Sequence, residues 1–164
     1  MSKKDKEIKT NAMRILDKMK ISYEHFSYEA GDFIDGKTTA EKLGLPFELV
    51  YKTLVAKSGN GDYFVFVVPI EKELDLKAAA KSVGVKSVEM IHVRDLTAVT
   101  GYVRGGCTSV GMKKQYVTRV DNSAEKLDFI YVSAGKIGVQ LKLSPYDLIK
   151  ANQGEFADIC ERLQ

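Results

Sequence analysis

Four glycines fall within eleven positions of the segment 101–111, which reads Gly-Tyr-Val-Arg-Gly-Gly-Cys-Thr-Ser-Val-Gly. Glycine has no side chain, so it lets the backbone approach a ligand closely and adopt positive φ. Successive backbone N–H groups can then converge on an anion or on the oxyanion of a reacting carbonyl. The segment lacks the Gly-Lys-Ser/Thr ending of a nucleotide P-loop. It predicts either an oxyanion-binding loop or a tight turn that leads into a strand.

A second run of small residues, Ser-Ala-Gly-Lys-Ile-Gly at 133–138, follows the apolar stretch 129–132. Such a run is typical of a hairpin connection. It also leaves room for a ligand, because large side chains are missing from it. The sequence alone does not decide between these two interpretations.

Lys52 stands at the head of a strand-like segment, with apolar residues on both sides of it. Many lysines in strands simply point to solvent. An ammonium group held at the edge of a cleft would instead bind a phosphate or stabilise an oxyanion without a metal.

Cys107 directly follows two of the glycines, which makes it a candidate nucleophile that would need a base. Only His25 and His92 could serve, and the sequence gives no reason for either to meet it. A buried, unreactive thiol is the more typical role for such a cysteine.

Composition limits the class of protein. Hydrophobic residues make up 45% and charged residues 29% of 164 residues, which is typical of a globular chain. The longest apolar run, 63–70, is too short to span a bilayer, and no secretory signal is visible, so we expect a cytoplasmic protein without a membrane partner. Two cysteines and two histidines at scattered positions predict no structural zinc site and no disulfide framework.

The charge balance is mildly basic. Lysine and arginine number 25 against 22 acidic residues, which gives a net charge of +3. This excess is too small for a protein that depends on nucleic-acid charge alone, and no DNA partner is expected. Small basic groups at 3–6, 18–20, 77–86 and 113–119 are each typical of a solvated face, although they permit a local basic surface.

Hydrophobic periodicity and turn residues predict the elements that position these residues. We expect helices at 5–19, from a capping box at Thr38 to Gly44, at 75–82, at 94–99, from Ser144-Pro145 onward and at 155–162. We expect strands at 22–28, 51–57, 63–69, 115–120, 128–133 and 137–143, with a hairpin loop at 58–62. Strands joined by hairpins and mixed with helices predict an α+β fold, with a mixed sheet curled towards a barrel and no repeated parallel units. One domain over 1–164 is the simplest organisation, and a site is expected in the irregular segments 28–37, 101–111 and 133–138.

These segments, taken with Lys52, resemble the YbaK-like trans-acting editing domains, and among them the bacterial Cys-tRNA(Pro) deacylases. The matching stretches are Tyr51-Lys52-Thr53-Leu54, 74–81, Val88-Glu89-Met90, Thr100-Gly101-Tyr102 with Gly105-Gly106, 111–114, 130–138 and 156–159. They follow the family's order along nearly the whole chain.

The resemblance implies a compact domain with a barrel-like mixed sheet surrounded by helices. It implies hydrolysis of the ester of a mischarged aminoacyl-tRNA without a cofactor, with the tRNA acceptor end and prolyl-tRNA synthetase as partners. By the same resemblance the catalytic residues are Lys52, Gly105 and Gly106. The residues that it implies for substrate binding are Tyr28, Phe33, Thr53, Ser133, Ala134 and Gly135.

An aminoacyl ester is already activated, so the protein mainly has to hold the carbonyl and stabilise negative charge. For a cysteinyl ester, the resemblance implies that the substrate's own thiol attacks the ester. Two positions depart from the family: Thr108-Ser109 replaces its usual Ser-Pro, and Gln140 stands where relatives often have an acid or a serine. These departures bear on amino-acid choice more than on reaction type.

Three alternatives remain open at this point. The chain could act on Ala-tRNA or Ser-tRNA within the same fold. It could be a non-catalytic module that binds tRNA or prolyl-tRNA synthetase. It could also be a hydrolase with Cys107 as its nucleophile.

Overall fold

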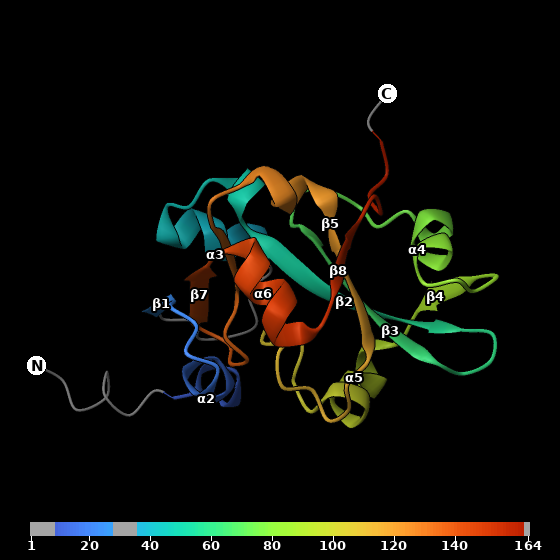
Figure 1. Cartoon of the computed structure of the whole chain (residues 1–164), viewed down its shortest axis with the longest axis horizontal. Helices are drawn as coiled ribbons and strands as arrows, with labels where there is room; N and C mark the ends of the chain where they lie inside the picture. Colours follow the sequence, from blue (N-terminus) through green and yellow to red (C-terminus); the bar gives the residue numbers. More distant parts are fainter. Residues whose placement is uncertain (1–8, 28–35, 163–164) are drawn as a thin grey trace, which may run out of the picture.

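A computed structural model describes residues 9–27 and 36–162 of the chain (Figure 1). Tyr28 and Phe33 lie outside the described residues. The helices are α2 (Asn11–Lys18), α3 (Gly36–Leu43), α4 (Leu76–Ser82), α5 (Val93–Thr100) and α6 (Pro145–Asn152), with 3-10 turns η1 (Phe47–Leu49) and η2 (Asn122–Lys126). The strands are β1 (Glu24–Ser27), β2 (Tyr51–Ser58), β3 (Tyr63–Pro69), β4 (Val88–Met90), β5 (Val117–Asp121), β6 (Ile130–Ser133), β7 (Val139–Leu143) and β8 (Glu155–Ala157).

The strands form two sheets, one ordered β4-β2-β3-β5-β8 and the other β1-β7-β6. The predicted hairpin is confirmed, because β2 and β3 pair antiparallel from Tyr51↔Pro69 to Lys57↔Tyr63. An isolated parallel bridge, Val50↔Tyr131, connects the two sheets. The fold is therefore the predicted mixture of helices and strands, although the described strands form two sheets rather than one closed barrel.

Parallel pairing is more extensive than the sequence indicated. β3 pairs parallel with β5, and β5 pairs parallel with β8. Each of these parallel neighbours is reached by a long connection that contains at least one helix, as parallel pairing requires. These connections also contain other strands, so the sheet is mixed, as predicted, and is not built from repeated strand–helix–strand units.

Four apolar clusters lie among the described residues, and the two largest form most of the core. The larger one contains Leu16 of α2, Leu141 of β7 and Leu148 of α6, all without solvent exposure. The second lies under α4 and includes Phe66 and Ile159. Each fully buried side chain of this size contributes about 1.5–3 kcal/mol to folding.

Caps set several helix boundaries. The first described helix begins at Asn11, because the Thr10 hydroxyl accepts a hydrogen bond from Met13 N at 3.1 Å. Residues 5–8 of the predicted helix lie outside the described residues. Asp75 and Ser144 cap α4 and α6 as predicted. Thr38 lies inside α3, so the capping box predicted there was wrong.

The end of the chain was also predicted wrongly. Residues 155–157 form β8, whose partners are Arg119–Asp121 of β5, and not the start of a helix. Gln153 ends α6 in the left-handed conformation, with φ of +57°. The short strand β4, which pairs with the end of β2, was not predicted.

No helix within residues 9–27 and 36–162 combines the length and the apolar character needed to cross a membrane.

Candidate active site at the glycine-rich loop

The glycine-rich segment begins where α5 ends. Gly101 takes φ of +89°, and its N–H donates to Thr97 O at 2.8 Å, which closes the helix. Farther along, the Tyr102 hydroxyl donates to Val110 O at 2.6 Å. This buried hydrogen bond ties the two ends of the segment together, so the residues between them form a closed loop.

The structure brings the two glycine-bearing segments into contact. A Cβ on Gly106 would lie 3.0 Å from Ile137 N, and a Cβ on Gly135 would lie 2.9 Å from the ring of Tyr102. A Cβ contact as short as that at Gly135 is almost never found, and one as short as that at Gly106 is tighter than most, so glycine suits both close approaches. The loop at 101–111 therefore rests on the segment 133–138.

Beside this contact lies a pocket of about 180 Å³, here called the Thr53 pocket. Its lining comes from β2, from β4 with the start of α5, and from the glycine loop: Thr53, Leu54, Val55, Met90, Ile91, His92, Val93, Leu96, Arg104, Gly105 and Cys107. Most of these side chains are apolar. The pocket is smaller than the roughly 300–1,000 Å³ of typical drug-sized sites, so it suits a small group.

The two catalytic glycines expected from the sequence have different positions. Gly105 lines the Thr53 pocket with φ of +88°, and its N–H donates to no other described residue. The Gly106 N–H donates to Val103 O at 3.0 Å within the loop. The geometry thus favours Gly105 as a donor to a ligand, whereas Gly106 serves the packing of the loop.

The small residues at the end of β6 form a tight turn. Ala134 is fully buried and its N–H donates to Val139 O at 3.0 Å. The Ser133 hydroxyl accepts from Gly135 N at 3.2 Å. These bonds fix the turn, which faces the loop through the contact of Gly135 with Tyr102.

Lys52 precedes Thr53 on β2, and successive side chains in a strand point to opposite faces. Its ammonium group lies 3.4 Å from Ile70 O. Burial raises the pKa of the Cys160 thiol to about 12, and the Lys52 charge opposes this shift only weakly. Among the described residues, Lys52 is not one of those that line the Thr53 pocket. Val50 and Tyr131 form a parallel bridge, so β2 and β6 run in the same direction from that point. Lys52 and Ser133 each lie two residues beyond this bridge.

Cys107 shares the Thr53 pocket with His92, which the sequence did not indicate. Burial raises the pKa of the Cys107 thiol to about 11, although a hydrogen bond with Thr100 opposes this shift. A thiol with this pKa is protonated at neutral pH and is therefore a poor nucleophile. His25 lies on β1, in the other sheet.

Sequence reasoning missed one side of this pocket. Met90, Ile91, His92 and Val93 reach it because β4 pairs with β2, where Ala56 lies opposite Met90. The stretch 88–90 was part of the family resemblance. Its three residues are too short to give a strand signal by alternation.

Comparison with known proteins gives the family. A family model described as an aminoacyl-tRNA editing domain matches residues 35–151. A protein of Enterococcus faecalis, EbsC, named as a candidate Cys-tRNA(Pro)/Cys-tRNA(Cys) deacylase, is 42% identical over 160 residues, which cover 97% of this chain and 98% of that protein.

Two solved structures show the same fold. The hypothetical protein APE2540 has a TM-score of 0.81 at 22% identity, over 90% of this chain and 97% of its own. A candidate trans-editing enzyme for prolyl-tRNA synthetase has a TM-score of 0.76 at 19% identity, over 94% and 99%. With the family model and the full-length relative, these matches establish that the chain belongs to the aminoacyl-tRNA editing domain family.

Proposed function

We propose that this protein is a trans-acting deacylase that hydrolyses the aminoacyl ester of Cys-tRNA(Pro), or of Cys-tRNA(Cys). The observation that carries the proposal is the 42% identity, over almost the full length of both chains, to a relative named for these two substrates. The small, mostly apolar Thr53 pocket beside the glycine loop supports it.

The pocket suits a cysteinyl group in size and in character. Cysteine behaves as a small hydrophobic side chain, and six of the lining residues are leucine, isoleucine, valine or methionine. Shape alone separates cysteine from alanine or serine by only about 1–3 kcal/mol. The reaction itself must therefore supply much of the selectivity.

The substrate thiol supplies that selectivity. Its sulfur attacks the ester carbonyl carbon, so that a C–S bond forms and the bond from carbonyl carbon to the ribose oxygen breaks. The thiol proton passes to the leaving ribose oxygen, which regenerates the tRNA hydroxyl. Water then opens the resulting thiolactone to free cysteine. An alanyl ester lacks the sulfur and cannot take this route.

The protein's part is to hold the ester and stabilise the developing oxyanion. Gly105 lines the pocket, and its N–H donates to no other described residue, which supports this role. Lys52 adds positive charge near the terminal adenosine or its phosphate. Thr53 and the turn at 133–135 position the substrate, together with Tyr28 and Phe33 from the segment outside the described residues.

The wider setting follows from the same proposal. The mischarged tRNA presents its acceptor end, prolyl-tRNA synthetase is the partner that releases such products, and the reaction takes place in the cytoplasm. The whole chain, 1–164, acts as one domain.

The test is the release of labelled cysteine from Cys-tRNA(Pro) in the presence of EDTA. The Lys52→Ala variant should lose at least about 100-fold in rate, because the positive charge that holds the terminal adenosine or its phosphate is removed and the ester is no longer oriented. Lys57→Ala, an exposed lysine on the same strand, is the matched control and should keep full activity.

Three results would overturn parts of the proposal. Full activity in Lys52→Ala would remove Lys52 from the mechanism. Cleavage of a substrate whose thiol is methylated, at the same rate as the free thiol, would show that water and not the substrate sulfur is the nucleophile. Release of alanine or serine in place of cysteine would point to the alternative specificity.

A further inference from the structure

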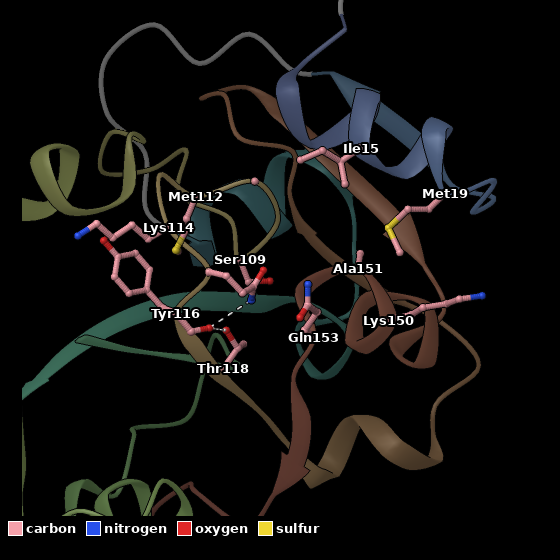
Figure 2. Close-up of a pocket in the computed structure, with 12 residues that line it drawn as sticks. Ile15, Met19, Ser109, Met112, Lys114, Tyr116, Thr118, Lys150, Ala151 and Gln153 are labelled. Atoms are coloured by element: carbon pink, nitrogen blue, oxygen red, sulfur yellow. Dashed lines mark hydrogen bonds between the residues drawn. The ribbon is translucent and has the colours of Figure 1, made fainter. Parts of the chain in front are cut away.

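A second pocket, of about 230 Å³, lies on the other side of the glycine loop, between that loop, α2 and α6 (Figure 2). We call it the lysine pocket, because Lys114 and Lys150 are among the residues that line it. No acidic residue occurs among the described residues of its lining. The function proposed above does not use it.

Residues far apart in the sequence give this pocket its charge. Lys114 lies three residues after the glycine loop, Lys150 lies on α6, and Met19 follows Lys18 at the end of α2. Lys18 is exposed and lies three residues after Ile15, another lining residue, so it borders the same face of the helix. Basic groups that looked like separate solvated faces in the sequence therefore meet around one cavity.

Neither Lys114 nor Lys150 forms a hydrogen bond or ion pair with another described residue. Lys150 lies in the last turn of α6, where a cation also favours the helix dipole. Lys114 lies outside any helix, so that explanation does not cover it.

The floor of the pocket is polar and firmly held. Ser109 accepts a hydrogen bond from Asn152 Nδ2 at 3.0 Å, and both residues are buried. Asn152 O in turn accepts from Gln115 Nε2 at 2.7 Å. The loop is thereby fastened to the end of α6, which gives the pocket a defined shape.

The arrangement of charge selects the ligand. Figure 2 shows Lys114 and Lys150 on opposite sides of the pocket, each extending away from its centre. A single phosphate ion could not be held by both. A strand with repeated phosphates could, with one phosphate near each lysine and its sugar and base over the lining between them.

The position of the pocket points to the same ligand. Cys107 lines the Thr53 pocket and Ser109 lines the lysine pocket, only two residues along the chain. Their Cα atoms are at most about 7 Å apart. An RNA whose 3′ end enters the Thr53 pocket therefore has its backbone close to the lysine pocket.

We propose that the lysine pocket binds the ribose-phosphate backbone of the substrate tRNA's acceptor arm and so orients its 3′ end. This inference rests on the function proposed above, because that function supplies the RNA. Its test separates RNA binding from chemistry.

The test uses Lys114→Ala/Lys150→Ala and measures binding of a fluorescent, uncharged RNA hairpin with the acceptor-stem and 3′-terminal sequence of tRNA(Pro). We expect about 10-fold weaker binding near 0.1 M salt, and a slope of log K against log[salt] that is smaller by about 1.5, as two lost phosphate contacts require. The control, Lys57→Ala/Lys86→Ala, makes the same change in net charge at exposed lysines elsewhere and should bind normally. The double variant Lys114→Arg/Lys150→Arg keeps the charge and should also bind normally.

Hydrolysis of 3′-O-cysteinyl adenosine, which has no RNA backbone, gives the second measurement. The Lys114→Ala/Lys150→Ala variant should cleave it at the unaltered rate. Unchanged RNA binding in that variant, or equal weakening in the control pair, would overturn the proposal. A matching loss on the small ester would also overturn it, because the defect would then be structural. If no protein cleaves any ester, the proposed function fails, while the binding result still decides the role of the lysine pocket.

Discussion

The two pockets on either side of the glycine loop differ in almost every physical property. The Thr53 pocket is lined mainly by apolar side chains and by the backbone of Gly105. The lysine pocket has two glutamines, buried hydroxyls and two ammonium groups that pair with no side chain in the described part of the chain. One suits a small, neutral side chain and a reacting carbonyl, whereas the other suits a charged chain.

One loop serves both pockets, so it must be rigid for them to cooperate. Its rigidity comes from close backbone packing on the Thr53 side and from side-chain hydrogen bonds on the lysine side. The loop therefore has two separate supports, and a single substitution can remove either one without the other.

The largest expected effect comes from the packing support. Gly135→Ala adds a Cβ 2.9 Å from the ring of Tyr102, which is held by its hydrogen bond to Val110 O, and it does so at φ of +95°. We expect a loss of about 3 kcal/mol in the free energy of unfolding, because backbone strain and overpacking add. Urea unfolding measures it.

Gly61→Ala is the matched control, since Gly61 also has positive φ but open space around it. Its free energy of unfolding should fall by only about 1 kcal/mol, because backbone strain is the one cost of this substitution. Equal losses in the two variants would show that the contact with Tyr102 does not hold the loop.

Local signals were enough to predict some elements of this fold. Asp75 and Ser144-Pro145 give caps that require only their immediate neighbours, and the helices begin there. The β2–β3 hairpin likewise follows from two strands joined by a short turn.

Other elements depend on partners distant in sequence. Residues 155–157 become a strand because β5 offers them a parallel edge, which no local pattern reveals. The three residues of β4 depend in the same way on β2.

The candidate site shows the same division. The glycine segments could be recognised from composition, but their contact through Gly106 and Ile137 depends on the topology. The same holds for the meeting of Cys107 with His92 and for the convergence of Lys114 and Lys150.

A smaller effect comes from the hydrogen-bonded support. Ser109→Ala leaves the buried Asn152 amide without an acceptor and should cost about 2 kcal/mol in urea unfolding. Because this support lies on the lysine side, RNA binding should weaken more than cleavage of the small cysteinyl ester. Ser87→Ala, at an exposed position, should lie within about 0.5 kcal/mol of the unaltered protein. An unchanged stability in Ser109→Ala would mean that the loop does not depend on this bond.

The smallest effect tests whether the Thr53 pocket depends on a protein nucleophile. Burial raises the pKa of Cys107 from its usual value of 9.0 to about 11. The folded protein holds the Cys107 proton more tightly than the unfolded chain does. The contribution of this proton to the free energy of unfolding is therefore fully present below pH 9. It is lost as the pH rises through 11, by about 1 kcal/mol at pH 10.

Between pH 8 and pH 10, the free energy of unfolding should therefore fall less in Cys107→Ala than in the unaltered protein. Burial raises the pKa values of Tyr51 and Cys160 to about 12, and these two groups contribute equally to the pH dependence of both proteins. At neutral pH its rate on Cys-tRNA(Pro) should stay within about threefold, because a protonated thiol takes no part in the proposed reaction. Loss of that activity in a variant that remains folded would make Cys107 the nucleophile and His92 its base. The Thr53 pocket would then contain the catalytic nucleophile, and the lysine pocket would only bind RNA. In the proposed reaction, by contrast, both pockets hold the substrate and the substrate supplies the nucleophile.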